Sequence, residues 1–175
     1  KWYREAIIYE MHIRDWSKGI SSSNIGKFDE ITAGLGTNGN GTLGLHLKDL
    51  GITHLWLTGV IRHSTLTAYP ELGIKATNPL ITKGKAGSPY SIMDYYDIDP
   101  DLAVNPNDRI AEFEELLARI HEKGMKVIID FIPNHLAREY KSLNKPFDVE
   151  EFGEYDNKNV GFSKDNNFYY CPNQK

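Results

Sequence analysis

The stretch KVIIDFIPNH, residues 126–135, is an apolar run that one acidic residue interrupts and that ends in Pro-Asn-His. Apolar runs without alternating polar positions are typical of parallel strands that are buried on both faces. The alternation of a strand places Ile128, Asp130 and Ile132 on one face, so the Asp130 carboxylate points into an apolar layer. An unpaired carboxylate is costly there and needs a cation or several hydrogen-bond donors. A carboxylate that only ties neighbouring strands or loops together is an equally good interpretation.

Asn134 and His135 follow at the carboxyl end of this predicted strand. In α/β folds, ligands bind at this edge of the sheet. The Asn134 amide can hydrogen-bond hydroxyl groups or bind a hard cation, and the His135 ring can donate to an oxygen. A single histidine is more often structural than functional, but the pattern Asp-x-x-x-Asn-His at a strand end favours a binding site.

Apolar strands alternate with helical patterns along the rest of the chain, which predicts an α/β protein built from right-handed βαβ units. Only three such strands are recognisable, whereas a closed (β/α)₈ barrel needs eight strands and roughly 250 residues. The chain of 175 residues is therefore either a small open sheet or the first part of a larger barrel. The predicted elements are a strand at 6–13, a short helix near 28–35, a helix at 43–50, a strand at 52–61, an aperiodic segment at 62–108, a helix ending at Gly124 and a strand at 126–132.

The two longer helices have boundary signals and apolar stripes. Thr42 is suited to cap the first helix, and Gly51 is suited to stop it. Asn107 or Asp108 can cap the second helix, which Gly124 ends. The stripes consist of Leu43, Leu47 and Leu50 in the first helix and Ile110, Phe113, Leu116, Leu117 and Ile120 in the second.

The composition excludes several classes of protein. The net charge is −4 and no basic cluster is present, so the sequence predicts no nucleic-acid partner. No apolar run reaches the roughly 20 residues of a membrane span, and KWYREAIIYE (1–10) lacks the apolar stretch of a signal peptide. A signal that had been removed would leave no trace, so the compartment stays open. The single Cys171 excludes an internal disulfide framework.

Five stretches resemble the α-amylase family of glycoside hydrolases, in the right order over residues 6–138. DFIPNH resembles the family's first signature region, at the end of the third barrel strand. The variant Y-E-x-H-x-R-D near the N-terminus is typical of pullulanase-like and branching-enzyme-like members. The matching stretches are IIYEMHIRDWS (7–17), LGLHLKDLGITHLWLTGV (43–60), GSPYSIMDYYDIDPDL (87–102), FEELLARIHEKGMKVIIDFIPNH (113–135) and, within the last, DFIPNH (130–135).

The resemblance implies a fold and a set of roles. Residues 1–138 would form the first three β/α units of a (β/α)₈ TIM barrel, and 139–175 would begin the inserted B domain after the third strand. The roles that the resemblance implies are a pairing of Asp130 with an arginine on the fourth strand, a hydrogen bond from His135 to the sugar in subsite −1, stacking of Tyr90 on that sugar, an acid near the site for Asp94, and a Ca²⁺ ligand in many members for Asn134.

The catalytic groups of the family are not visible in this sequence. Retaining glycosidases use two carboxyl groups about 5 to 5.5 Å apart, a nucleophile and a general acid. In the family these follow the fourth and fifth strands, with a further Asp after the seventh, and residues 1–175 end before them. The Asp-x-Asn-x-Asp-Gly pattern that binds Ca²⁺ after the first strand is also absent, so Ca²⁺ rests on Asn134 alone. No organic cofactor is expected.

Three functional interpretations are open. The first is part of an enzyme that hydrolyses or transfers α-1,4 or α-1,6 linkages of α-glucan oligo- or polysaccharides, and whose 175-residue piece alone is inactive. The second is a non-catalytic relative that binds carbohydrate or a partner, and the third is an unrelated open α/β domain. The set Tyr90, Asp130 and His135 favours the first interpretation. With three strands, apolar edges and faces of the piece should also be left uncovered.

Overall fold

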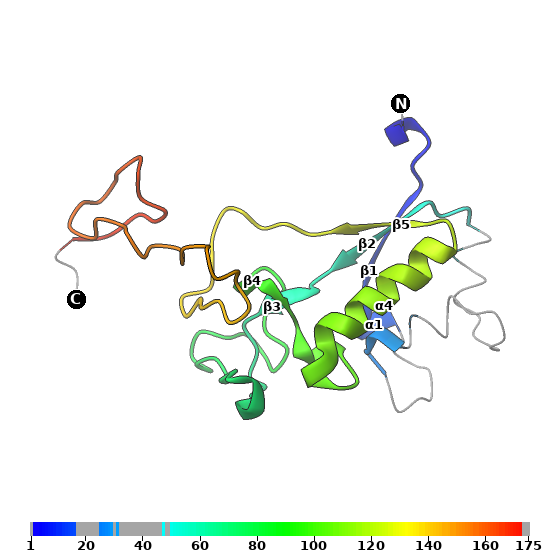
Figure 1. Cartoon of the computed structure of the whole chain (residues 1–175), viewed down its shortest axis with the longest axis horizontal. Coiled ribbons are helices and arrows are strands. Elements are labelled where there is room, and N and C mark those ends of the chain that lie inside the picture. The colour runs from blue at the N-terminus through cyan, green and yellow to red at the C-terminus, as the bar shows by residue number, and fades with distance from the viewer. Residues whose placement is uncertain (1, 17–24, 30, 32–46, 48–49, 173–175) are drawn as a thin grey trace. The chain divides into compact units, whose positions relative to one another are not determined.

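The computed structural model of the protein describes residues 2–16, 25–29, 31, 47 and 50–172 (Figure 1). The chain divides into two compact units, residues 1–143 and residues 144–175. The domain boundary predicted between residues 138 and 139 stays a prediction. Within the described residues, no helix is long and apolar enough to cross a membrane.

The first unit contains a parallel sheet whose strands have the order β1–β2–β5. β1 is Ile8–His12, β2 is His54–Thr58 and β5 is Lys126–Ile129. The α/β class and the parallel pairing are as the alternating pattern predicts. Each strand is shorter than predicted, and β5 ends before Asp130 rather than at residue 132. Asp130 therefore lies directly after the strand, in a segment that leads to Pro133.

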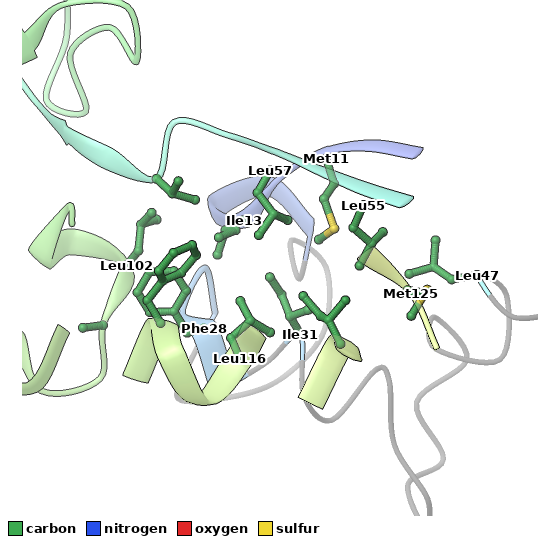
Figure 2. Packing of buried hydrophobic residues seen from close by; sticks show 14 residues of the cluster. Met11, Ile13, Phe28, Ile31, Leu47, Leu55, Leu57, Leu102, Leu116 and Met125 are labelled. Carbon is green, nitrogen blue, oxygen red and sulfur yellow. The ribbon is translucent and has the colours of Figure 1, made fainter. Parts of the chain in front are cut away.

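One face of this sheet packs against α4, which is Arg109–Glu122 (Figures 1 and 2). Three of the predicted stripe residues, Phe113, Leu116 and Ile120, are buried in the core, and Leu117 packs against it. Ile110 is 39% exposed, so its predicted place in the stripe is wrong. The buried residues of this core are Met11, Ile13, Phe28, Ile31, Leu47, Leu55, Leu57, Val60, Leu102, Ala103, Phe113, Leu116, Ile120 and Met125.

The boundaries of α4 follow the predicted signals in part. Asp108 occupies the N-cap position, but its side chain makes no capping hydrogen bond. Glu112 instead accepts from the backbone N–H groups of Val104 and Asn105, both at 2.7 Å. Gly124 has a φ of +76° directly after the helix, in the left-handed region that favours glycine. The predicted end of the helix is thereby confirmed.

The predicted helix at 43–50 lies outside the described residues except for Leu47, which is buried, and Leu50, which is exposed. Of the predicted helix near 28–35, residues 28, 29 and 31 are helical and the rest lie outside the described residues. The first unit also contains a short 3₁₀ helix η1, Trp2–Arg4, and a short helix α1, Ile13–Trp16.

The segment at 62–108, predicted to be aperiodic, contains an antiparallel ribbon of two strands. β3 is Ile61–His63 and β4 is Ile92–Ile98, with irregular register between them. Three 3₁₀ helices complete the segment: η2 (Pro70–Leu72), η3 (Pro100–Leu102) and η4 (Pro106–Asp108). The hydrophobic pattern does not predict β4 because Asp94 and Asp97 take buried positions in it.

The strand β5 was predicted to be buried on both faces, and this is wrong in the described structure. Ile129 is 39% exposed and Phe131, just beyond the strand, is 71% exposed. Ile8 on β1 is also exposed. β1 and β5 are the outer strands of the sheet, while the central strand β2 is largely buried. The exposure of Ile8 and Ile129 on the outer strands agrees with the prediction that a sheet of three strands leaves apolar residues uncovered.

The second unit consists of turns and bends over its described residues 144–172. The Asp156 carboxylate organises it by accepting from the backbone N–H groups of Asn167 and Phe168, at 2.8 and 2.9 Å, and from the Tyr170 hydroxyl at 2.9 Å. Desolvation acts to raise the pKa of Asp156, but these hydrogen bonds lower it. The Asp156 carboxylate thus connects two parts of this unit that no regular secondary structure joins.

Candidate functional site

The carboxyl ends of the three parallel strands lie at one edge of the sheet, as they must in a parallel arrangement. His12 ends β1, Thr58 ends β2 and Asp130 follows β5. Gly59, Pro89 and Asp130 are among the residues that line a small recess at this edge. Asp130 therefore lies at the predicted edge of the sheet, and it shares this recess with Gly59 and Pro89, which follow β2 in the sequence.

Asp130 is half-buried and accepts a hydrogen bond from Nε1 of Trp56 on β2. Among the described residues it forms no ion pair. The hydrogen-bond donor that the predicted burial of Asp130 requires is thus the indole N–H of Trp56 on the adjacent strand. Sequence reasoning missed this partner. The arginine partner that the resemblance implies stays a prediction.

Asn134 and His135 are both exposed, in the segment that follows β5. Asn134 Nδ2 lies 3.3 Å from His135 Nδ1, so the two side chains are oriented together. Exposed amide and imidazole groups are available to bind hydroxyl groups of a ligand. Their place after β5 agrees with the predicted location, while the contacts to sugar and metal stay predictions.

Backbone and side-chain contacts fix the segment that carries these two residues onto β4. The N–H of Ala137 donates to the carbonyl of Ile92 at 2.9 Å, and the N–H of Lys141 donates to the carbonyl of Met93 at 3.0 Å. The Tyr95 hydroxyl donates to the carbonyl of Ile132, and burial raises the pKa of this hydroxyl. The segment is therefore held on both sides of Asn134 and His135.

Tyr90 is 50% exposed and precedes β4. Its neighbour Pro89 packs against Gly59, where an added Cβ would lie 2.9 Å from Pro89 Cβ and 3.2 Å from His12 Nε2. Gly59 also has a φ of +74°. A glycine at the end of β2 thus permits the close approach of the Tyr90 segment to the sheet edge. The stacking of the half-exposed Tyr90 on a sugar stays a prediction.

Asp94 is completely buried, with 0% of it exposed. Its carboxylate accepts from the N–H of Leu143 at 2.6 Å and from the N–H of Tyr96 at 2.9 Å, and it pairs with Arg62 Nη2 at 3.3 Å. No surface of Asp94 is open to a sugar in the described residues, so the predicted substrate contact stays a prediction. The contacts that it makes here fix the end of the segment after β5.

A buried ion network, which sequence reasoning missed, connects the ribbon to α4. Arg62 Nε lies 3.1 Å from Asp97 Oδ2, an ion pair without hydrogen-bond alignment. Arg109 Nε donates to Asp97 Oδ1 at 2.6 Å, and Arg109 Nη2 donates to Oδ2 at 3.1 Å. Arg62 Nη2 also donates to the Lys141 carbonyl at 2.6 Å. The pairing of Arg109 at the first position of α4 explains why it is buried while Ile110 is exposed.

His63 forms a second buried pair in the ribbon. Its Nδ1 lies 3.0 Å from Asp99 Oδ2 and 3.1 Å from the Ile61 carbonyl, and its Nε2 lies 3.2 Å from the Ala86 carbonyl. Both ring nitrogens thus face acceptors, which favours the doubly protonated imidazolium. Burial acts to lower the pKa of His63, but the Asp99 carboxylate beside the ring outweighs it, and the pKa is raised.

Asn134, the predicted Ca²⁺ ligand, is exposed in the segment after β5. Ca²⁺ takes six to eight oxygen ligands. The described residues contain no group of three or more His, Cys, Asp or Glu side chains that could hold a metal ion. Such groups do not include amide and backbone carbonyl oxygens, so Ca²⁺ binding by Asn134 stays a prediction.

Comparisons with known proteins give the family of this chain. Residues 45–173 match the model of the alpha amylase catalytic domain. Maltase A2 of Drosophila melanogaster is 26% identical over 159 residues, which are 89% of this chain and 22% of that protein. Pullulanase A of Streptococcus pneumoniae is 36% identical over 140 residues, which are 77% of this chain and 10% of that protein. A crystal structure of an alpha-amylase from Lactobacillus plantarum has a TM-score of 0.53 and 30% identity, over 81% of this chain and 25% of that chain.

These matches relate the α/β chain to proteins named as a maltase, a pullulanase and an alpha-amylase. More particularly, the chain belongs to the alpha-amylase family, because the family model covers most of its length. The resemblance to this family is thereby confirmed, while the assignment of residues 130–135 to a signature region stays a prediction. The structural neighbours support the TIM-barrel fold, while the number of barrel units in this chain stays a prediction. The chain spans only 22% and 10% of the length of the two curated relatives.

Proposed function

We propose that this chain is the substrate-binding N-terminal part of a retaining glycoside hydrolase or transglycosylase that acts on α-1,4 or α-1,6 linkages of α-glucans. The observation that carries the proposal is the segment DFIPNH, which follows the parallel strand β5 in a chain of the alpha-amylase family. The names of the relatives support the substrate class, since they include a maltase and a pullulanase.

The described residues supply binding groups for a sugar. His135 and Asn134 present exposed polar groups, and Tyr90 presents a half-exposed ring. An aromatic ring can stack on the apolar face of a pyranose, while amide and imidazole groups bind its hydroxyls. Contacts at the reacting sugar that tighten in the transition state raise the rate of the chemical step.

The nucleophile and general acid are placed by this proposal on strands outside residues 1–175. Residues 1–138 then form three β/α units of the barrel, and 139–175 begin the B domain. The exposed Ile8 on β1 and Ile129 on β5 support further strands at both edges of the sheet. Hydrolysis or transfer would proceed through a glycosyl-enzyme intermediate on the nucleophile. The 175-residue piece alone should be inactive because it lacks both carboxyl groups.

The test is an assay of the full-length protein and of residues 1–175 on maltose, maltotriose, starch and pullulan. The full-length protein should release or transfer glucose units, and the piece should not. His135→Ala should lower kcat more than it raises KM, by about 100-fold if the contact forms mainly in the transition state. A folded full-length protein without activity on every glucan would instead support the non-catalytic interpretation, with glucan binding measured by calorimetry.

A further inference from the structure

The face of the parallel sheet that lies opposite the apolar core carries Trp56. Trp56 pairs in register with Ile128 on β5. Because side chains alternate along a strand, Trp56 points away from the face of Leu55 and Leu57, which belong to the core beside α4. The same alternation brings Ile128 and the following Asp130 to the Trp56 face, where the indole N–H meets the carboxylate.

The Asp130 carboxylate depends on this contact for its direction. It follows β5 by one residue, so no strand pairing of its own backbone holds it. Trp56 lies on the central strand β2, which is paired on both sides, by β1 and by β5. The indole Nε1 is therefore a fixed donor, and it occupies Oδ1 of Asp130. Among the residues that the structure describes, Trp56 is the side-chain donor to Asp130, and it contacts Oδ1 rather than Oδ2.

We propose that Trp56 is a positioning residue of the glucan site, which acts by fixing the orientation of Asp130. This inference rests on the proposed function and adds to it a residue outside the signature region. A hydrogen bond to an ionised carboxylate is stronger than one between neutral groups, so one indole N–H can hold the carboxylate in a single orientation. Trp56 itself need not touch the sugar.

Two substitutions that each remove an indole N–H, together with the five-membered ring that carries it, provide the test. Trp56→Phe keeps an aromatic ring on β2 and removes the donor to Asp130. Trp16→Phe is the matched control, since among the described residues no acceptor is in reach of Trp16 Nε1, which is buried. Trp16 packs edge-on against Tyr9, with ring centroids 5.7 Å apart. Both variants are made in the full-length protein and assayed on the glucan that the wild type turns over best.

The expected result is a fall in kcat of roughly tenfold for Trp56→Phe, with KM nearly unchanged, as the loss of a hydrogen bond to a charged group predicts. Trp16→Phe should keep the wild-type kcat. A rise in KM at constant kcat for Trp56→Phe would overturn the inference, because it would mean that the indole binds the sugar directly. Equal kcat values for the two variants would also overturn it.

A double-mutant cycle with Asp130→Ala shows whether Trp56 acts through Asp130. Adding Trp56→Phe to Asp130→Ala should cause no further loss of kcat, because the donor then has no carboxylate to orient. A further tenfold loss would overturn the inference. If Asp130→Ala does not fold, as thermal unfolding will show, the comparison of Trp56→Phe with Trp16→Phe decides alone. A folded wild type that is inactive on every glucan refutes the proposed function and this role with it, whereas an active wild type with an unchanged Trp56→Phe refutes this role only.

Discussion

The ribbon β3–β4 lies in the sequence between β2 and β5 of the parallel sheet β1–β2–β5, but different chemistry holds each of the two regions. The sheet is held by an apolar core that includes Leu55, Leu57 and Leu116. The ribbon instead buries the charged side chains of Arg62 and Asp97. Apolar burial is tolerant of small rearrangements, whereas a buried charge needs its partner in place. The ribbon should therefore be the more easily broken of the two regions.

The largest effect is expected at a glycine in the segment that connects the two strands of the ribbon. Gly87 has a φ of +65°, and a Cβ there would overlap the backbone carbonyl of Ser64. Backbone cannot move aside as a flexible side chain can, so Gly87→Ala should reduce the free energy of unfolding by at least about 5 kcal/mol. Urea denaturation of the wild type and the variant measures this difference.

Gly51 provides the control, since it precedes β2 with a φ of +67°. An added Cβ there would lie 3.8 Å from Ile7 Cδ1, an ordinary contact. Gly51→Ala should therefore reduce the free energy of unfolding only by the strain of a left-handed backbone at alanine, about 1 to 2 kcal/mol. Similar decreases in the free energy of unfolding for both variants would mean that backbone strain, and not the close approach of residue 87 to the Ser64 carbonyl, determines the effect.

The second largest effect is expected from the ion network. Arg62→Met leaves Asp94 and Asp97 buried with fewer cationic partners, and breaking a buried pair in this way typically costs about 3 to 5 kcal/mol. Arg119→Met is the control, because Arg119 on α4 pairs at 3.6 Å with the exposed Glu115. The control should change the free energy of unfolding by less than about 1 kcal/mol. A loss for Arg62→Met as small as that of the control would show that the ribbon does not depend on its ion pairs.

This contrast explains what the sequence could predict. The parallel sheet and α4 follow from apolar runs and from a helical stripe, and the end of α4 follows from Gly124. The ribbon does not follow, because Asp94 and Asp97 take the positions where a hydrophobic pattern expects apolar residues. A signal was nevertheless present: the acids Asp94 and Asp97 in an aromatic stretch, together with Arg62 and His63 after β2, suggest buried ion pairs.

The candidate site divides in the same way. Asn134 and His135 could be placed at a strand end because the edge of a parallel sheet is a general ligand site. The partner of Asp130 could not, because it depends on which residue of β2 is in register with Ile128. If the pairing of β2 with β5 had been assumed, the alternation of side chains along the strands would have indicated Trp56 as a residue on the same face as Asp130. The shortening of β5 was not predictable from its apolar run, which continues past the last paired residue.

A pH dependence of stability is the third expected effect. The pKa of His63 is raised in the folded protein by Asp99, so its contribution to stability is fully present below the unfolded pKa of about 6.5. That contribution is lost as the pH rises through the higher folded-state pKa. The free energy of unfolding of the wild type, relative to His63→Gln, should therefore decrease as the pH rises above about 6.5.

His121→Gln is the matched control for this measurement, since His121 is exposed near the end of α4. Its free energy of unfolding should follow that of the wild type across the same range. A constant difference between the wild type and His63→Gln at every pH would show that His63 does not carry an additional proton in the folded state. The ribbon would then bury the Asp99 carboxylate without a charged partner at His63.

The smallest effect is expected on the sheet, at a contact that has the same length as one in the ribbon. The Thr58 hydroxyl donates to Glu10 Oε1 at 3.1 Å, the distance that also separates Arg62 Nε from Asp97 Oδ2. Glu10 is exposed, so water can replace the lost donor, and Thr58→Val should change the free energy of unfolding by less than about 1 kcal/mol. Urea denaturation at a fixed pH measures it beside Arg62→Met. A loss of several kcal/mol for Thr58→Val would mean that contact length, rather than burial of the carboxylate, determines the stability of both regions.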